Sequence, residues 1–264
     1  MPRIRHILFP YDFSAHGDRT VPYVRAMAER FDARITMLTV LPPGSGPAPT
    51  PLILGELRGL AVEPATDGGD PAFRIVEFAK THDVDLIMMP THGVGGFRTM
   101  LVGSVTAKVL HDADCPIWTA AHAEVQTASA APRTILCALD EREAATSLAA
   151  WTRDFAASWG AHLQLLHVLG PVTDWASLDS ERRLQEQVRE ETRDRLEARL
   201  AAAGLRLPFR VAVGGIVSTV VEEARQQRAD VIVVGRGSIA EPFGRLRTHA
   251  FGIIQRSGYP VVSV

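Results

Sequence analysis

The chain has 264 residues, of which 46% are hydrophobic and 22% charged, and its 28 basic and 30 acidic residues give a formal net charge of −2. This composition is typical of a globular protein with a substantial core and excludes a chain that is mainly disordered. The near-neutral charge, without a block of like charge, argues against nucleic acid as a partner.

Short apolar runs alternate with helical patterns from the N-terminus onward. In chain order, the first 120 residues predict a strand at 7–10, a helix at 21–31, a strand at 35–41, a helix at 71–81, a strand at 86–89, a helix at 106–111 and a strand at 116–119. Apolar runs without strict alternation favour strands that are covered on both faces, and intervening helices favour a parallel sheet. The pattern therefore indicates a doubly wound α/β domain.

The second half of the chain repeats the first. At an offset of 128 residues the shared positions are Arg5, Ile7, Leu8, Asp12, Ala33, Leu38 and Val40, and at an offset of 145 they are Gly69, Val76, Glu77, Ala79, Asp85 and Ile87. Such a repeat predicts two similar units. We therefore expect a domain at 1–120, a linker at 121–132 that is rich in Ala, Thr and Ser, and a second domain at 133–264.

A long helix is expected only in the second half. Residues 179–203 carry an apolar stripe, with Ser180 placed to cap the start and Gly204 to end the helix; the stripe consists of Leu184, Val188, Leu196 and Leu200. The matching stretch of the first half, 42–60, is shorter and rich in Pro and Gly. We expect this helix to pack on its own sheet rather than on a membrane or a partner.

We expect a cytoplasmic protein. Apolar runs such as 231–234 and 86–89 are far shorter than the roughly 18 residues that a membrane-spanning helix needs. The N-terminus enters a strand-like run at once, so we expect no signal peptide. The two cysteines, Cys115 and Cys137, lie in apolar strand-like contexts and are expected to be buried free thiols.

Polar and glycine-rich segments follow the strands of the first half. Pro10 and Asp12 come after the first strand, and Val40 comes after the second. Met89 and Pro90 lead into a loop with His92 and Gly93, and after that loop come Gly103, Ser104, Val105 and Thr106 at the start of a helix. Ligands of parallel sheets bind outside the carboxyl ends of the strands. Glycines before a helix N-terminus leave backbone amides open to a phosphate, and hydroxyls there can donate to it. The segment is neither a Walker A loop nor a dinucleotide fingerprint.

Each of these residues also has a purely structural interpretation. Asp12 could hold a turn after its strand, His92 could be an ordinary loop residue, and the glycines could serve tight turns. No nucleophile or second carboxylate is placed beside His92, so we assign no catalytic residue. The nine histidines show no zinc-type spacing, so no structural metal is expected.

These motifs resemble those of the universal stress protein family, whose ATP-binding pattern is Gly, two residues, Gly, nine residues and Gly-Ser/Thr. The resemblance covers both halves and implies two flavodoxin-like (adenine nucleotide alpha hydrolase-like) domains, each with a five-stranded parallel sheet covered by helices on both faces. It implies that ATP with Mg²⁺ binds in the first half, with the adenine near Asp12 and Val40 and the ribose near Met89 and Pro90. The phosphates would lie on His92, Gly93, Gly103, Ser104, Val105 and Thr106.

The chain departs from the family pattern at several positions. Pro90 stands where the first glycine belongs, which removes one amide donor. In the second half Asp140 and Gly235 are kept, but Ser238 and the pair Thr248-His249 replace the second glycine and the Gly-Ser step. We expect no ATP in the second half, because side chains there would occupy the space for phosphate. Three arginines in its loop could hold another anion, although a solvated loop face is the simpler interpretation: Arg236, Arg245 and Arg247.

We therefore expect an ATP-binding stress-response or signalling module with one site, whose occupancy changes a surface read by a protein partner that the sequence does not name. The alternatives are a slow ATP hydrolase and a nucleotide-free interaction scaffold. The resemblance also implies that the two domains pair through their last strands, 116–119 and 260–264, as an intramolecular pseudo-dimer, and a homodimer of whole chains stays open.

Overall fold

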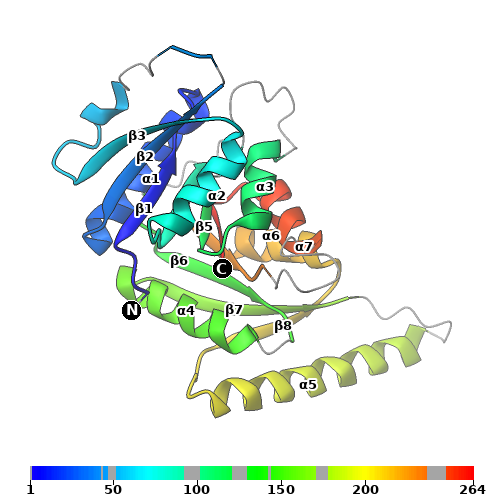
Figure 1. Ribbon diagram of the computed structural model, residues 1–264. Coiled ribbons are helices and arrows are strands. Elements are labelled where there is room, and N and C mark those ends of the chain that lie inside the picture. The colour runs from blue at the N-terminus through cyan, green and yellow to red at the C-terminus, as the bar shows by residue number, and fades with distance from the viewer. Residues whose placement is uncertain are drawn as a thin grey trace.

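Ten strands form one continuous sheet in the part of the chain that the computed structural model describes, which comprises residues 2–42, 44–46, 52–91, 102–120, 130–141, 144–170, 178–236 and 248–264. The strand order is β3-β2-β1-β4-β5-β10-β9-β6-β7-β8. Each half of the chain contributes five neighbouring strands in the same internal order, and helices lie on both faces of the sheet (Figure 1). This arrangement confirms the predicted α/β class and the repeat.

The first half builds the sheet from β3 to β5. Its elements are β1 (His6–Pro10), α1 (Ala15–Phe31), β2 (Arg34–Leu41), the 3-10 helix η1 (Leu52–Gly55), β3 (Val62–Gly68), α2 (Pro71–Thr81), β4 (Leu86–Pro90), α3 (Ser104–Asp112) and β5 (Ile117–Ala120). All neighbouring strands within this half run parallel. After β3 the chain returns to the other side of β1, so the strand order reverses between β1 and β4.

The second half repeats this order. Its elements are β6 (Thr134–Leu139), α4 (Ala144–Trp159), β7 (His162–Leu169), α5 (Leu178–Ala202), β8 (Phe209–Val213), α6 (Ile216–Gln226), β9 (Val231–Val234), α7 (Thr248–Arg256) and β10 (Val261–Ser263). Its neighbouring strands are again parallel.

The two halves join where β5 pairs with β10 in the antiparallel direction. Val261 lies opposite Thr119, Val262 opposite Trp118 and Ser263 opposite Ile117. The expected pairing through the last strands is thereby confirmed. Because this seam is antiparallel, the carboxyl ends of the strands of one half lie on the edge of the sheet where the strands of the other half begin.

Two hydrophobic cores, one on each face of the sheet, run through both halves. Alternate residues of one strand enter different cores, as Phe9 and Leu8 of β1 show. The first core includes an aromatic cluster between the halves, made of Phe31 from α1 with Trp151, Phe155 and Trp159 from α4. The rings of Phe31 and Phe155 are stacked with centroids 6.1 Å apart. The halves therefore share both their sheet and their cores.

The repeated aspartates fasten the first strand of each half. One carboxylate oxygen of Asp85 accepts the main-chain amides of Arg5 at 2.7 Å and His6 at 3.0 Å. The equivalent oxygen of Asp230 accepts those of Arg133 at 2.7 Å and Thr134 at 2.9 Å. This part of the repeat is structural, because it lies at the amino ends of the strands.

Two elements of the first half differ from the sequence prediction. Helix α1 begins six residues before the expected 21–31, because Ser14 accepts the amide of Gly17 and caps a polar first turn, and because Pro22 is tolerated inside the helix. Strand β3 was missed altogether. It forms an edge of the sheet and is largely exposed, so it needs no apolar run and can include Pro64. Helix α2, in contrast, has the predicted bounds and is capped by Asp70.

The long helix α5 confirms the expected difference between the halves, since the first half has only the short η1 between β2 and β3. Ser180 lies inside the helix, so its assignment as the cap was wrong: the helix begins at Leu178. Gly204 does end it, with φ of +71° and with the amides of Gly204 and Leu205 donating to Ala201 and Leu200. Leu196 and Leu200 are buried, whereas Leu184 is 38% exposed because the N-terminal part of α5 extends beyond the strands (Figure 1).

Both cysteines are free, as expected; Cys137 is buried and Cys115 half-buried. Burial raises the pKa of the Cys137 thiol to about 12 and that of Cys115 to about 11. Neither thiol is therefore a thiolate near neutral pH. Among the described helices, none combines the length and the apolar character that crossing a bilayer requires.

Candidate functional site

The predicted site residues of the first half gather at the carboxyl edge of its sheet, beside the point where strand order reverses. Pro10 lies opposite Leu38, and Leu8 lies opposite Ile87, so the ends of β1, β2 and β4 reach the same level. The register thus places Asp12, Val40 and Pro90 at one edge, where parallel α/β sheets bind ligands.

Asp12 is exposed at the start of α1. Its Oδ1 accepts the amide of Ser14 at 3.1 Å, which fixes the turn between β1 and the helix. The neighbouring Tyr11 is buried, and its hydroxyl donates to Asp18 at 2.6 Å. Burial and this carboxylate raise the pKa of Tyr11 above its usual value, so the phenol stays neutral. Asp12 therefore holds the turn at the carboxyl edge of the sheet.

The start of α3 is tied to the end of β4. The amide of Gly103 donates to the carbonyl of Thr91 at 2.8 Å, and the hydroxyl of Thr106 donates to the carbonyl of Pro90 at 3.1 Å. Gly103 is the N-cap residue and, having no side chain, leaves the first turn of α3 without a side-chain cap. Uncapped amides at a helix N-terminus carry partial positive charge and favour an anion.

The predicted site residues differ in how far their side chains are exposed, and this decides which of them a ligand can reach. Ser104 is exposed, and Val40, Gly103 and Val105 are half-buried. Met89 is 4% exposed and packs in a core, so its side chain is not available to a ligand. Thr106 is buried, and its hydroxyl proton is directed to Pro90, which leaves Ser104 as the exposed hydroxyl. His92 and Gly93 lie outside the described residues.

The corresponding edge of the second half is occupied by side chains of its own. Glu141 follows β6, and its Oε2 accepts from Arg195 of α5 at 3.1 Å, while its carbonyl accepts from Arg199. His167, near the end of β7, has its Nε2 3.5 Å from Glu141. Asp140 is half-buried beside this group. In the described part of the chain, the long helix thus contacts the carboxyl edge of the second half through Arg195 and Arg199.

Arg236 corrects one sequence interpretation. It is 5% exposed rather than part of a solvated loop face, and it donates to the main-chain carbonyls of Leu110, Ala113 and Cys115 in the first half. It is therefore not available to hold an anion. Ser238, Arg245 and Arg247 lie outside the described residues, and Thr248 is the first residue of α7.

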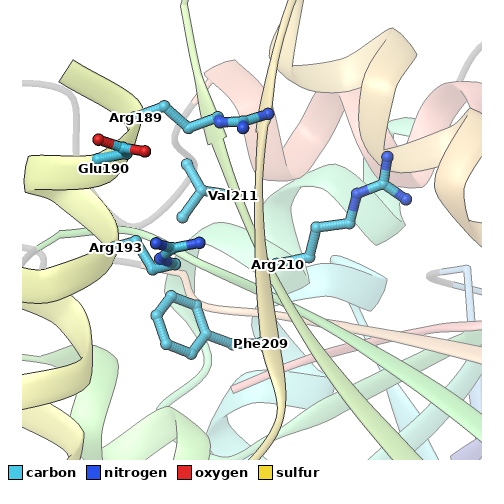
Figure 2. Close-up of a pocket in the computed structure, with 6 residues that line it drawn as sticks. All are labelled: Arg189, Glu190, Arg193, Phe209, Arg210 and Val211. Atoms are coloured by element: carbon cyan, nitrogen blue, oxygen red, sulfur yellow. The ribbon is translucent and has the colours of Figure 1, made fainter. Parts of the chain in front are cut away.

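A cavity of about 200 Å³ between α5 and the edge strand β8 was not anticipated from the sequence. Arg189 and Arg193 reach from α5 toward β8, and the ring of Phe209 faces the helix side, whereas Arg210 points to the other side of β8 (Figure 2). Arg189 is bound to Glu186 at 2.5 Å, and Arg210 to Glu223 at 3.2 Å. Because these two charges are already balanced, we assign no ligand to this cavity. Its sequence signal is the pair of arginines four residues apart on α5.

No cluster of three or more His, Cys, Asp or Glu side chains suited to a metal ion occurs in the part of the chain that the structure describes.

Comparison with known proteins agrees with this arrangement. The sequence matches the model of the Universal stress protein family over residues 52–120 and 132–262. A universal stress protein of Mycolicibacterium smegmatis is 26% identical over 260 residues, which cover 87% of this chain and 86% of that protein. One from Methanocaldococcus jannaschii is 39% identical over 64 residues, 24% of this chain and only 38% of that relative.

Solved structures share the whole fold. A functionally unknown protein from Pseudomonas aeruginosa aligns with a TM-score of 0.72 and 17% identity, over 99% of this chain and 92% of that one. A universal stress protein from Archaeoglobus fulgidus aligns with a TM-score of 0.63 and 19% identity, over 98% and 95% of the two chains. At these identities the likeness concerns the fold alone.

Proposed function

Because the chain belongs to the universal stress protein family, with two such domains in tandem, we propose that it is a cytoplasmic ATP-binding module of the stress response with one nucleotide site, in residues 1–120. The observation that carries this proposal is the glycine-capped start of α3, fastened to the end of β4 where strand order reverses. Occupancy of the site would change a surface that a protein partner reads.

The chemistry of this edge fits a nucleotide. The uncapped amides of the first turn of α3 and the exposed hydroxyl of Ser104 suit phosphate oxygens. Asp12 and Val40 lie across the edge from them and suit an adenosine moiety, the carboxylate for polar groups and the half-buried valine for the flat face of a base. Mg²⁺ would arrive with the phosphates, whose charge it offsets.

Pro90 stands where the family pattern has its first glycine. It has no amide to offer, and its carbonyl accepts from Thr106, so it contributes to the site through the position of α3 rather than through a donor. We therefore assign phosphate binding mainly to the Gly103 side of the loop.

We propose that the second half binds no ATP. There Glu141 is bound by Arg195 and Arg199 of α5, a helix that has no long counterpart in the described part of the first half. In addition, Ser238 and Thr248 replace the two glycines at which the backbone would approach the phosphates. These contacts and substitutions together favour a structural role for the second half.

Calorimetric titration of Mg²⁺-ATP into the intact chain tests both statements. We expect binding at about one site with a micromolar dissociation constant, corresponding to about −8 kcal/mol. Gly103→Val should abolish it. Gly103 has φ of −59° and ψ of 148°, which valine also adopts, so this change tests close approach rather than folding.

Thr248→Val is the matched control in the second half and should leave affinity unchanged. The proposal is refuted if the titration gives no heat and if ATP does not displace a labelled nucleotide from the chain. That result would favour a nucleotide-free scaffold. Release of phosphate from the bound nucleotide by the native chain would instead favour the slow hydrolase.

A further inference from the structure

An arginine of the second half contacts the helix that begins at the candidate nucleotide site of the first half. Arg236 follows β9, and its side chain is almost completely buried, at 5% exposure. Its Nη1 donates to the carbonyls of Leu110 at 3.2 Å and Ala113 at 3.0 Å, and its Nη2 donates to that of Cys115 at 2.5 Å. Leu110 lies in the last turn of α3, Ala113 is its C-cap residue, and Cys115 lies three residues after the end of the helix.

Two of these carbonyls, those of Leu110 and Ala113, are groups that a helix end cannot satisfy alone. The last carbonyls of an α-helix have no partner within the helix and carry partial negative charge. A buried guanidinium needs several well-placed acceptors, because burying it unpaired is costly. The guanidinium of Arg236 supplies donors to these carbonyls, and the carbonyls supply acceptors to the guanidinium. Loss of the arginine would therefore leave buried acceptors without a donor.

The other end of α3 is the candidate phosphate site. The helix has nine residues and is therefore about 14 Å long. Thr91 and Pro90 of the first half hold its start, and Arg236 of the second half holds its end. The antiparallel seam explains this arrangement: the edge where the strands of the second half end is the edge where α3 ends.

The equivalent position in the first half is Thr91, 145 residues earlier, at the end of β4. The hydroxyl of Thr91 donates to Ala120 of its own half at 3.2 Å. The main-chain amide of Arg236 donates to Val264 at 2.9 Å, in the corresponding place after β10. The two positions thus match in the fold, and in the second half the long side chain is directed across the seam.

We propose that Arg236 is a positioning residue for the nucleotide site: by fixing the end of α3 it keeps the amides at Gly103 and Ser104 in place, and it couples the second half to ATP binding in the first. This inference rests on the proposed function.

The test compares Arg236→Met, which keeps the apolar stem and removes the donors, with Arg236→Lys and with Arg210→Met, all in the full chain. Arg210 is a matched control, because it is a second-half arginine paired with the buried Glu223 and takes no part in holding α3. Circular dichroism establishes folding, calorimetry gives the affinity for Mg²⁺-ATP, and amide hydrogen exchange reports on α3.

We expect Arg236→Met to accelerate amide exchange over residues 110–115 without changing it in α2, and to weaken ATP binding about tenfold, within the usual range of coupling between sites. Arg236→Lys should change the exchange of α3 and the affinity for ATP less than Arg236→Met does. Arg210→Met should change neither the exchange nor the affinity. In the native chain ATP should also slow exchange at 231–236, and this effect should be lost in Arg236→Met, since coupling is reciprocal.

Native affinity and native α3 exchange in a folded Arg236→Met would overturn the inference. If that variant does not fold, Arg236→Gln, which retains one amide donor, takes its place with the same expectations. If the native chain binds no ATP, the proposed function fails and the coupling to ATP fails with it, while the exchange data still decide whether Arg236 holds α3.

Discussion

Replacing Phe155 by alanine should destabilise both halves of the chain together. Phe155 is 1% exposed, and its ring lies 6.1 Å from that of Phe31 in the first half and 5.1 Å from that of Trp151. Removing a fully buried phenylalanine costs about 3–5 kcal/mol of unfolding free energy, from lost burial and the cavity left behind. Phe73, which is 54% exposed, is the matched control and should cost less than about 0.5 kcal/mol.

Urea denaturation measures these costs, followed by tryptophan fluorescence and by far-ultraviolet circular dichroism. Coincident transitions indicate that the halves unfold as one unit. A double-mutant cycle with Phe31→Ala should give a coupling energy of about 0.5–1.5 kcal/mol, the usual value for a ring pair. A cost below about 1 kcal/mol for Phe155→Ala, or a transition of the first half that does not move, would refute the conclusion that the aromatic cluster joins the halves.

Two further predictions concern the amino ends of the strands. Asp85→Ala and Asp230→Ala should each lower the unfolding free energy by about 1.5–3 kcal/mol, because each carboxylate accepts two main-chain amides, and chemical denaturation should give the same cost for both within about 0.5 kcal/mol; clearly unequal costs would contradict the equivalence of the repeats. Burial lowers the pKa of His6 from 6.5, so the unfolded state binds the proton more readily and the native state should lose stability as the pH falls below about 6.5. Denaturation of the native chain and of His6→Gln at pH 7.5 and 5.5 should show the smaller loss in the variant, and equal losses would refute the role of His6.

Sequence patterns located most of the fold because apolar runs and helix caps are local signals. The bounds of α2 were predicted correctly, and the seam followed from the family resemblance. Strand β3 gave no such signal, since an edge strand exposes most of its side chains. The start of α1 was also obscured, because its first turn is polar.

The candidate site was predictable to the level of the sheet edge, and less so for individual side chains. A glycine before a helix and an aspartate after a strand are visible in the sequence, and the register of β1, β2 and β4 then places them at one level. The sequence could not show that Thr106 donates inward to Pro90 or that Arg236 lies buried against Leu110. Such contacts depend on which segments meet across the seam.

The antiparallel pairing of β5 with β10 gives the chain the symmetry of a dimer without the constraint that a dimer imposes. In two identical subunits every substitution appears twice, so an arginine at the end of the fourth strand would be present at both carboxyl edges. Joining the halves in one chain allows Thr91 to stay at one edge while Arg236 stands at the other. One half can then keep the residues of the candidate site, while the other half contributes an arginine that binds the end of α3.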